Sequence, residues 1–584
     1  MNLLSSFIVG NLEDKTGLLV YPELIKKFGH QALTWVNYPF NSFIINGITN
    51  EPVFWAVYLL LASKLDSVLV YNLIVFGSVL LIFFTSYIFF KGFGFSRFLS
   101  FLLGLTITFS PLVYYQAGNH PTMLQAWMVI LYIHFLTKAE KAKHFVLLGL
   151  FMTFIALTNN YFGYFSVLIA LSFLVSKEIV CRFLSTKYIT KKVLANYFLM
   201  FVTFGLLTIS LLFPYVKTNY LVDDEAQLTT YSKANFSWKV DPETTTQTLL
   251  DSKRKLEDFF TFTSRPWYYV LPSPRNPFIG GITTKTVAFL QDEWGYFLAQ
   301  NHFPAEHSAS YFGWTNLIFA AIGFSVVRRK LVALKASDKP DLEDHKLVTL
   351  SVLGFTALIL ILLTMPPYFT LNSVKIYMPS YVLFKTFTMF RVLSRLGFFT
   401  TLFLLLFTGY GYQHMLQRLG TRLVKNSKVL AFILIPFTAI SLLEFYVPVR
   451  ILNVTTPPEV YTYIRDQTPQ DSVLAVYPFT KTTSALFYIT HFQRRFINPA
   501  GFNRPEYGFD SNKFTDKLIT CTGVLEARNL GATHILYFDL DEIDSQRAKM
   551  QSFLEKPNIL TLDQSFDDST LYQLKPDGEC FSAN

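Results

Sequence analysis

Charged residues are scarce in this chain. Of its 584 residues, 15% are charged, 51% are hydrophobic and 17% are aromatic. Soluble domains contain about 25% charged residues, so the composition excludes an ordinary series of soluble domains. The apolar residues are instead gathered into long runs, and we expect a multi-pass membrane protein.

A basic stripe with interleaved aromatic residues is also absent, although the formal net charge is +10. Nucleic acid is therefore not an expected partner. An excess of Lys and Arg is typical of the cytoplasmic loops of membrane proteins, and here it falls in alternate loops between the apolar runs.

Cysteine is rare and never occurs in a CxxC motif, which disfavours a zinc site or a redox motif. The three cysteines are Cys181, Cys521 and Cys580. The last two fall in the C-terminal region, where they either form a disulfide, if that region is exported, or remain unpaired thiols. No glycine-rich phosphate loop follows the strands predicted there, so a nucleotide-binding fold is not supported.

Ten apolar segments are candidates for membrane-spanning helices, since a span requires roughly 20 mainly apolar residues. They cover residues 66–90, 97–115, 122–137, 145–159, 161–176, 193–215, 310–327, 347–365, 396–413 and 428–447. A further run at 52–63 is too short to span the membrane. We expect it to lie at the interface or to re-enter part-way.

The loops between these segments differ strongly in charge. One set, at 91–97, 138–144, 177–192, 328–346 and 413–428, carries about twenty Lys and Arg residues, and the alternate loops carry about three. The positive-inside rule makes the first set cytoplasmic. The N-terminus is then outside, although MNLLSSFIVG is too short to span and lacks the form of a signal peptide. Either the first span inserts in reverse or, as we favour, a first helix precedes this sequence.

Five regions are expected on this basis. They are an external N-terminal loop (1–50), a first part of the transmembrane bundle (51–215), a long external loop (216–309), a second part of the bundle (310–448) and an extracytoplasmic α/β domain (449–584). The last region has a soluble composition. Its patterns predict helices at 457–467, 513–530 and 541–556 and strands at 472–479, 533–540 and 569–575.

Candidate chemistry lies in the external loops, because reactive groups of a membrane protein must face a water-filled or lipid-lined cavity. Glu13 and Asp14 are the first acids of the chain. Transfer of a sugar to a hydroxyl requires a base for the acceptor proton, and a carboxylate can serve. From spacing alone, solvated loop acids are the commoner explanation.

Arg391 and Arg395 are four residues apart at the external end of a predicted span, so they are expected to share a helix face. Two guanidinium groups at headgroup level can hold a phosphate and stabilise it as it departs. The alternative is that they snorkel to lipid headgroups or pair with acids of the long external loop.

Further polar residues could line the same cavity. They are His120 in the loop 116–121, Asn159 and Asn160 at an external junction, and Glu306 just before a span. We assign them to substrate binding, although a lone His is more often a structural residue. No ligand set for a divalent metal is evident, so the metal and any other cofactor stay unassigned.

Five short stretches carry a family resemblance. They are Gly10-Asn11-Leu12-Glu13-Asp14, NHPTMLQAWMVILYIHFL (119–136), VLPSPRNPF (270–278), FRVLSRLGFF (390–399) and SALFYITHFQRRFINPAGF (484–502). With the many spans and the exported domain, they resemble the GT-C superfamily of multi-spanning glycosyltransferases, especially its poorly characterised bacterial members. The first loop of those proteins often reads Gly-Asp-x-x-Asp.

The resemblance implies an α-helical polytopic membrane protein of the GT-C type, located in the plasma membrane, with a C-terminal extracytoplasmic α/β domain. It implies a sugar donor linked to a polyprenyl phosphate, an acceptor on the outer face and a loop carboxylate as base. That base would be Asp14, assisted by Glu13. Asn11 replaces the first acid of the motif, and an Asn also stands where the superfamily has an acid near residues 159–161.

Three functions are weighed. The leading hypothesis is a membrane glycosyltransferase whose partners are a lipid-phosphate-linked sugar, membrane lipids and a cell-envelope glycan, lipid or protein acceptor. The alternative is a non-catalytic membrane scaffold that displays a surface-binding domain, which the replaced acids favour. A transporter of lipid-linked sugars ranks third, because no inverted repeat is evident and intramembrane acids are nearly absent.

Overall fold

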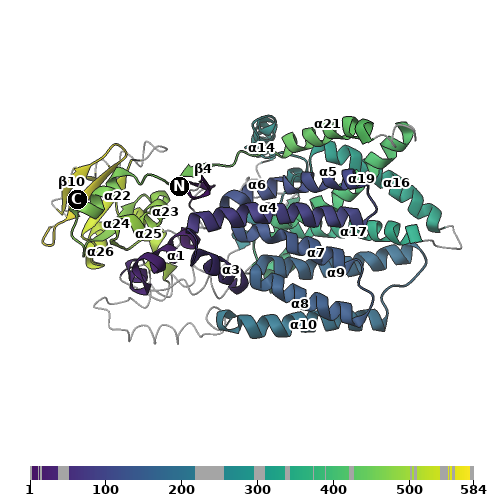
Figure 1. Ribbon diagram of the computed structural model, residues 1–584, viewed down its shortest axis with the longest axis horizontal. Coiled ribbons are helices and arrows are strands. Elements are labelled where there is room, and N and C mark those ends of the chain that lie inside the picture. Colours follow the sequence, from purple (N-terminus) through teal and green to yellow (C-terminus); the bar gives the residue numbers. More distant parts are fainter. Residues whose placement is uncertain are drawn as a thin grey trace.

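A helical bundle lies beside a smaller part built on a mixed sheet in the computed structural model of this chain (Figure 1). The two parts follow one another along the longest axis of the molecule. The structure describes residues 3–10, 12, 16–36, 38, 51–216, 256–294, 310–335, 342–371, 374–388, 390–419, 427–499, 503–504, 509–539, 550, 553–554 and 559–578.

Each of the ten predicted apolar segments is helical. The bundle consists of α3 (Pro52–Ala62), α4 (Ser67–Gly92), α5 (Arg97–Thr108), α6 (Pro111–Asn119), α7 (Ala126–Leu136), α8 (Ala142–Thr158), α9 (Asn160–Phe183), α10 (Lys191–Val216), α16 (Trp314–Lys335), α17 (Leu342–Thr364), α19 (Gly397–Leu419) and α21 (Ser427–Phe445). The short 3-10 helix η3 (Pro121–Gln125) joins α6 to α7.

The expected number of about ten spans is not confirmed. Among the described residues, five helices are long and apolar enough to cross a membrane, or six if α5 and α6 form one span bent by 48°. The other apolar helices are shorter: α7 has 11 residues and is only about 16 Å long, against a hydrocarbon core of roughly 30 Å. The chain is nonetheless a multi-pass membrane protein.

The basic loops lie at one end of this bundle. The turns from α4 to α5, from α7 to α8 and from α9 to α10 are all at the end remote from the C-terminal sheet (Figure 1). The positive-inside argument therefore separates the two ends of the bundle as expected. The C-terminal sheet lies at the opposite end (Figure 1).

The C-terminal part is a five-stranded sheet in the order β10-β11-β9-β5-β6. Its strands are β5 (Val473–Tyr477), β6 (Arg495–Phe496), β9 (His534–Phe538), β10 (Leu560–Ser565) and β11 (Ser569–Leu574). β5 runs parallel to β6 and β9, and β11 runs antiparallel to β9 and β10. The three predicted strands are therefore confirmed, and β6 and β10 are additional.

Among the described residues, five named helices accompany this sheet. They are α22 (Glu459–Gln467), α23 (Phe479–Phe487), α24 (Ile489–Phe492), α25 (Ser511–Lys517) and α26 (Cys521–Asn529). The helix predicted at 457–467 is confirmed as α22. The single helix predicted at 513–530 is wrong, because the chain turns between α25 and α26, where the Thr520 side chain caps the new helix by accepting from the Gly523 amide at 3.2 Å. The helix predicted at 541–556 falls mainly outside the described residues.

The N-terminal segment, expected to be a loop, contains regular structure. It forms the helix α1 (Thr16–Phe28), the 3-10 helix η2 (His30–Trp35) and the strand β1 (Phe7–Val9), which pairs with β4 (Ile451–Asn453) just before the sheet. Val36 makes an isolated parallel bridge with Phe496 of β6. The first residues of the chain are thus joined to its last part.

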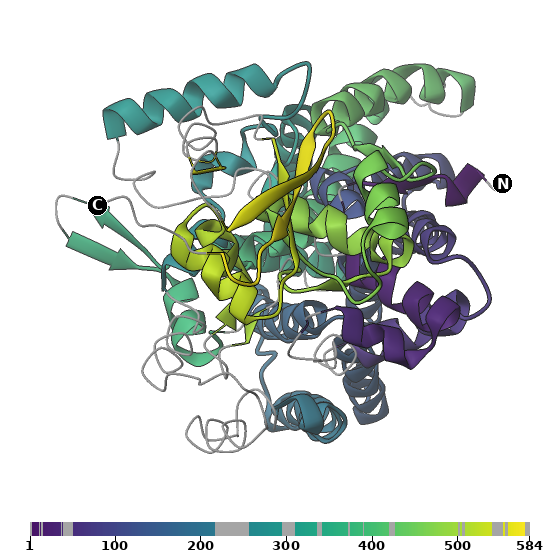
Figure 2. The same ribbon diagram turned by 90° about the vertical axis from the view of Figure 1, so that its left-hand side faces the viewer.

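Helix α1 is buried on two sides. Leu18 and Leu19 belong to the apolar core of the bundle, whereas Val20 and Leu24 belong to the core on one face of the C-terminal sheet. Viewed from the sheet end, the sheet overlies the bundle, with α1 beside it in purple (Figure 2). Helix α1 therefore packs against both parts.

A buried carboxylate fixes the contact between α1 and the bundle. Glu23 of α1 accepts from the amide and the hydroxyl of Ser67, at 3.1 and 3.3 Å, in the first turn of α4. Its other neighbours are Lys26 and Lys27, at 3.8 and 3.5 Å. A carboxylate at a helix N-terminus is stabilised by the free amides and the helix dipole.

Gly10 permits the closest backbone approach between the N-terminal segment and the bundle. Its φ is +89°, and a Cβ there would lie 1.9 Å from the carbonyl oxygen of Gly118 in α6. The Gly10 amide donates to the Arg450 carbonyl at 2.6 Å, next to the β1–β4 pair. The residue that opens the first-loop motif therefore has a strict steric reason to be glycine.

We expect Gly10→Ala to lower the free energy of unfolding by more than the roughly 1–2 kcal/mol of left-handed strain, because a backbone clash is added. Gly118→Ala is the matched control, since a Cβ there meets nothing closer than 3.4 Å. Thermal unfolding of both purified variants measures the difference. Equal midpoints for the two would contradict the steric argument.

Candidate functional site

Polar side chains from four segments meet at the end of the bundle nearest the sheet. The segments are the start of α3, the 3-10 helix η3, the α8–α9 junction and the 3-10 helix η8 (Leu393–Leu396) that precedes α19. They contribute Glu51, Thr122, Asn159, Tyr161 and Arg395. We call these five residues the mouth cluster.

Asn159 is the structural centre of the mouth cluster. It ends α8 and caps α9, where its Oδ1 accepts from the amide of Phe162 at 3.0 Å. Its Nδ2 donates to Oε1 of Glu51 at 2.9 Å. The residue has no exposed surface, so both ends of the amide are used inside the protein. The sequence pattern correctly placed Asn159 at this junction.

Glu51 is the residue that sequence reasoning missed. It immediately precedes Pro52, the first residue of α3, and its carboxyl is held by Asn159 and by a hydrogen bond with Thr122. Loss of solvation raises the pKa of Glu51 to about 8, and the charge of Arg395 and the Thr122 hydrogen bond limit the rise. Near neutral pH this carboxyl is therefore largely protonated.

Arg395 brings the positive charge of the mouth cluster. It is only 7% exposed, and its guanidinium carbon lies 5.2 Å from the centre of the Tyr161 ring. Stacking on an aromatic ring is favourable for a guanidinium group, more so when both are desolvated. The arrangement holds a cation in a partly water-excluded place beside a carboxyl that is neutral at physiological pH.

Arg391 and Arg395 do not share a helix face, so that expectation is wrong. Helix α19 begins only at Gly397, and Arg391 precedes the 3-10 turn that contains Arg395. Arg391 is half-buried and lies 4.6 Å from the ring centre of Phe262. The guanidinium groups of Arg391 and Arg395 therefore lie against different aromatic rings, those of Phe262 and Tyr161.

The remaining predicted site residues divide into two groups. His120 and Asn160 are described: His120 joins α6 to η3, two residues before Thr122, and Asn160 opens α9 beside Asn159. Glu13, Asp14 and Glu306 lie outside the described residues. The structure thus places Asn159 and Arg395 in the mouth cluster. His120 lies just before η3, and Asn160 is the first residue of α9.

A metal centre is not evident where the chain is described, since no three His, Cys, Asp or Glu side chains there could hold an ion together. Cys181 is a free thiol and Cys521 is disulfide-bonded, while Cys580 lies outside the described residues.

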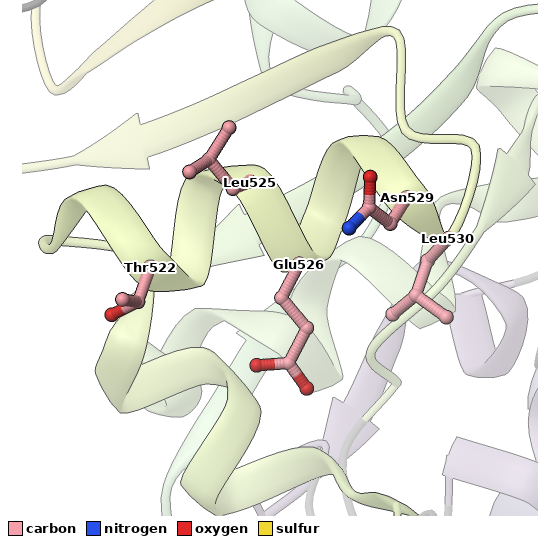
Figure 3. Close-up of a pocket in the computed structure, with 5 residues that line it drawn as sticks. All are labelled: Thr522, Leu525, Glu526, Asn529 and Leu530. Carbon is pink, nitrogen blue, oxygen red and sulfur yellow. The ribbon is translucent and has the colours of Figure 1, made fainter. Parts of the chain in front are cut away.

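A surface pocket lies elsewhere, on helix α26 of the C-terminal part (Figure 3). It has a volume of 360 Å³ and is lined by Thr522, Leu525, Glu526, Asn529 and Leu530. Glu526 also lies 3.5 Å from Lys517. None of the lining residues belongs to the mouth cluster, so this pocket is separate from the candidate site.

Comparison with known proteins gives likeness of fold only. No family model matches the chain, and no curated protein sequence is similar to it. Among solved structures, an oligosaccharyltransferase of Archaeoglobus fulgidus in complex with Zn and sulfate has 10% identity and a TM-score of 0.47, over 97% of this chain and 70% of that one. A second structure of the archaeal enzyme, AglB with an inhibitory peptide and a dolichol-phosphate, has the same identity and score over 91% and 66%.

The arabinofuranosyltransferase AftD from Mycobacteria is also similar, with 11% identity and a TM-score of 0.44 over 98% of this chain. The match spans 39% of the length of AftD. Both enzymes belong to the GT-C superfamily that the sequence motifs resemble. At such low identity and scores, any statement about chemistry has to come from the residues of this chain.

Asn159→Ala removes the cap of α9 and the donor to Glu51, and we expect a loss of about 1–2 kcal/mol in the free energy of unfolding. Asn159→Ser keeps a capping hydroxyl and loses the donor to Glu51, so its loss should be smaller. Thermal or denaturant unfolding in detergent compares the three proteins. Wild-type stability of Asn159→Ala would show that the junction does not depend on this side chain.

Proposed function

We propose that the protein is a membrane glycosyltransferase that takes a sugar from a polyprenyl-phosphate-linked donor and transfers it to an acceptor on the outer face. The observation that carries this proposal is the buried guanidinium of Arg395, held against Tyr161 beside Glu51 and Asn159 at the mouth of an apolar bundle. A desolvated cation at the end of an apolar bundle suits a phosphate whose tail remains in the membrane.

Arg395 would bind the phosphate of the donor and stabilise the charge that grows on it as the glycosidic bond breaks. Arg391, on the same connecting segment, would bind the donor from the side of Phe262. His120, Asn160 and Glu306 are proposed to line the substrate site around the mouth cluster. The phosphate then leaves on its lipid carrier while the sugar moves to the acceptor.

The acceptor hydroxyl needs a base, and we propose Asp14, assisted by Glu13. The support is local: Gly10, four residues before Asp14, is fixed against Gly118 of α6, two residues before His120. The first loop therefore departs from the bundle close to the segment that carries His120 and Thr122.

Glu51 is proposed to regulate the charge of the site. When protonated, Glu51 adds no negative charge beside Arg395, which leaves the attraction of the guanidinium for a phosphate undiminished. When ionised, it attracts the same guanidinium and repels the donor. Its partners Asn159 and Thr122 hold it in place in either state.

The remaining assignments belong to the same proposal. The protein would be located in the plasma membrane with its C-terminal α/β part outside, and its acceptor would be a glycan, a lipid or a protein of the cell envelope.

Arg395→Ala should reduce transfer from a polyprenyl-phosphate sugar by roughly 100-fold or more, the usual cost of losing one donor to a developing anion. Arg395→Lys keeps the charge without the planar fork and should recover part of the loss. Arg495→Ala is a matched control, because that guanidinium also lies over a ring, 5.1 Å from the centre of Tyr38, but at the sheet.

Transfer assays with a radiolabelled donor would measure these rates, and size-exclusion profiles would show whether each variant is folded. Full activity of a folded Arg395→Ala protein would contradict the assignment.

Donor binding should weaken as the pH rises through about 8, because Glu51 ionises there beside Arg395. Glu51→Gln mimics the neutral carboxyl and should bind the donor as wild type does at pH 7, without the decline at higher pH. The free energy of unfolding should also fall as the pH rises. The folded state holds the proton of Glu51 more tightly than the unfolded chain does, so wild-type stability falls between about pH 4.5 and about 8. Donor-binding curves that stay identical for both proteins as the pH rises from about 7 to about 9 would contradict the role of Glu51.

A non-catalytic scaffold remains the second candidate, because Asn11 replaces the first acid of the loop motif. Asp14→Asn discriminates between the two functions. A glycosyltransferase should lose transfer while it keeps its folding and donor binding. A scaffold would show no transfer in either form.

A further inference from the structure

An amphipathic hairpin projects from the end of the bundle nearest the sheet. Strands β2 (Tyr368–Leu371) and β3 (Val374–Tyr377) follow α17 and lead into the short helix α18 (Pro379–Thr386). Their antiparallel register opposes Tyr368 to Tyr377, Phe369 to Ile376, Thr370 to Lys375 and Leu371 to Val374. Residues that oppose one another lie on the same face of a hairpin.

The two faces of the hairpin differ in chemistry. One face carries Tyr368, Thr370, Lys375 and Tyr377, and the Lys375 ammonium lies 4.8 Å from the centre of the Tyr368 ring. The other face carries Phe369, Ile376 and Val374. Phe369 packs against the buried cluster of Tyr269, Phe312 and Met365, whereas Ile376 and Val374 are 47% and 65% exposed. Ile376 and Val374 therefore present exposed apolar surface on the face opposite Lys375.

The hairpin is continuous with a surface that faces lipid. Helix α17 is one of the spans, and Leu358 and Leu362 near its end are exposed. Val382 of α18 is also exposed, at 60%. Viewed along the bundle axis, the hairpin extends sideways beyond the helices, across that axis rather than along it (Figure 2). The hairpin therefore begins where this candidate span ends.

The residues of this segment match the membrane interface. Tyr and Lys side chains are enriched there, because the ring or the alkyl stem can lie in apolar surroundings while the polar end reaches headgroups. Tyr381 of α18 adds a ring 4.6 Å from that of Tyr377, and Lys385 lies 5.6 Å from the Tyr381 ring. The Tyr368 ring lies 4.8 Å from that of Phe260, so the base of the hairpin is held by protein contacts. Burial of the exposed Val374 and Ile376 side chains in lipid would stabilise the rest of the hairpin.

We propose that strands β2 and β3 and helix α18 lie flat in the interface of the leaflet nearest the C-terminal sheet, with Val374 and Ile376 toward the acyl chains and Lys375 among the headgroups. The occupant of the apolar face is therefore the bilayer itself. This proposal does not depend on glycosyl transfer.

The interfacial segment would set the depth of the chain that follows it. Phe387 ends α18, and the next residues reach the bundle through Phe390, whose ring stacks on Tyr164 with centroids 4.3 Å apart. Arg391 and Arg395 come directly after this contact. Fixing the hairpin at the headgroups would hold this short connection at the same level.

The test places an environment-sensitive fluorophore on single cysteines in the full-length chain. The positions are Ile376→Cys on the apolar face and Thr370→Cys on the opposite face, both in a Cys181→Ser background and without reductant. Val374→Cys repeats the apolar position, and Leu362→Cys on α17 is the positive control for lipid. Each protein is reconstituted into vesicles that contain acyl-chain spin-labelled lipid, with iodide as the quencher from water.

We expect fluorescence at 376 and 374 to be quenched mainly by the spin-labelled lipid, as at 362, and fluorescence at 370 mainly by iodide. The ratio of the two quenching constants should therefore reverse between the two faces. Dominant iodide quenching at 374 and 376 would overturn the proposal, since the hairpin would then stand in water. Dominant lipid quenching at all hairpin positions would also overturn it, because the hairpin would then be immersed rather than lying at the interface.

Discussion

Burial of both faces of two strands is the constraint on which the rest of this structure depends. Every residue of β5 and β9 is buried, so the sheet needs apolar cover on both sides. Helices α25 and α26 cover one face, and α1 joins the helices that cover the other. Because α1 also buries Leu18 and Leu19 in the bundle, the same helix that completes the sheet fixes it over the end of the bundle.

The mouth cluster is positioned by that arrangement and by helix ends within the bundle. The Asn159 side chain caps α9 and also donates to the carboxyl of Glu51. The same residue therefore fixes a helix end and a titratable group. Arg395 enters from a segment far away in the sequence and rests on Tyr161, two residues beyond that cap. Helix ends leave backbone groups without a partner in the helix, and polar side chains such as Asn159 are found there to pair with them. The charged site is therefore built from residues at helix ends, at one end of the apolar bundle.

Local patterns predicted most of the fold and part of the site. Apolar runs located all ten helical segments, and alternating or buried apolar residues located β5, β9 and β11. Helix α1 was missed because Pro22 and the polar residues around it are typical of a loop, while its burial comes from residues hundreds of positions away. The break between α25 and α26 was missed because their apolar spacing continues across it.

The site shows the same division between local and long-range information. Arg395 and Asn159 were recognisable, since Arg at an external helix end and Asn at a junction are locally unusual. Glu51 stands alone before a proline and has no informative spacing. Its raised pKa arises from burial, which the charge of Arg395 and the hydrogen bond with Thr122 only partly offset, and only the packed bundle creates this environment. The β1–β4 pair and the bridge from Val36 to Phe496 also impose an order of biogenesis. At about 5–20 residues per second, a ribosome needs roughly 20–90 s to make the 460 residues between these two positions. During that time α1 has been synthesised but its sheet has not, so the cell must keep its apolar side chains from aggregating until the last part of the chain arrives.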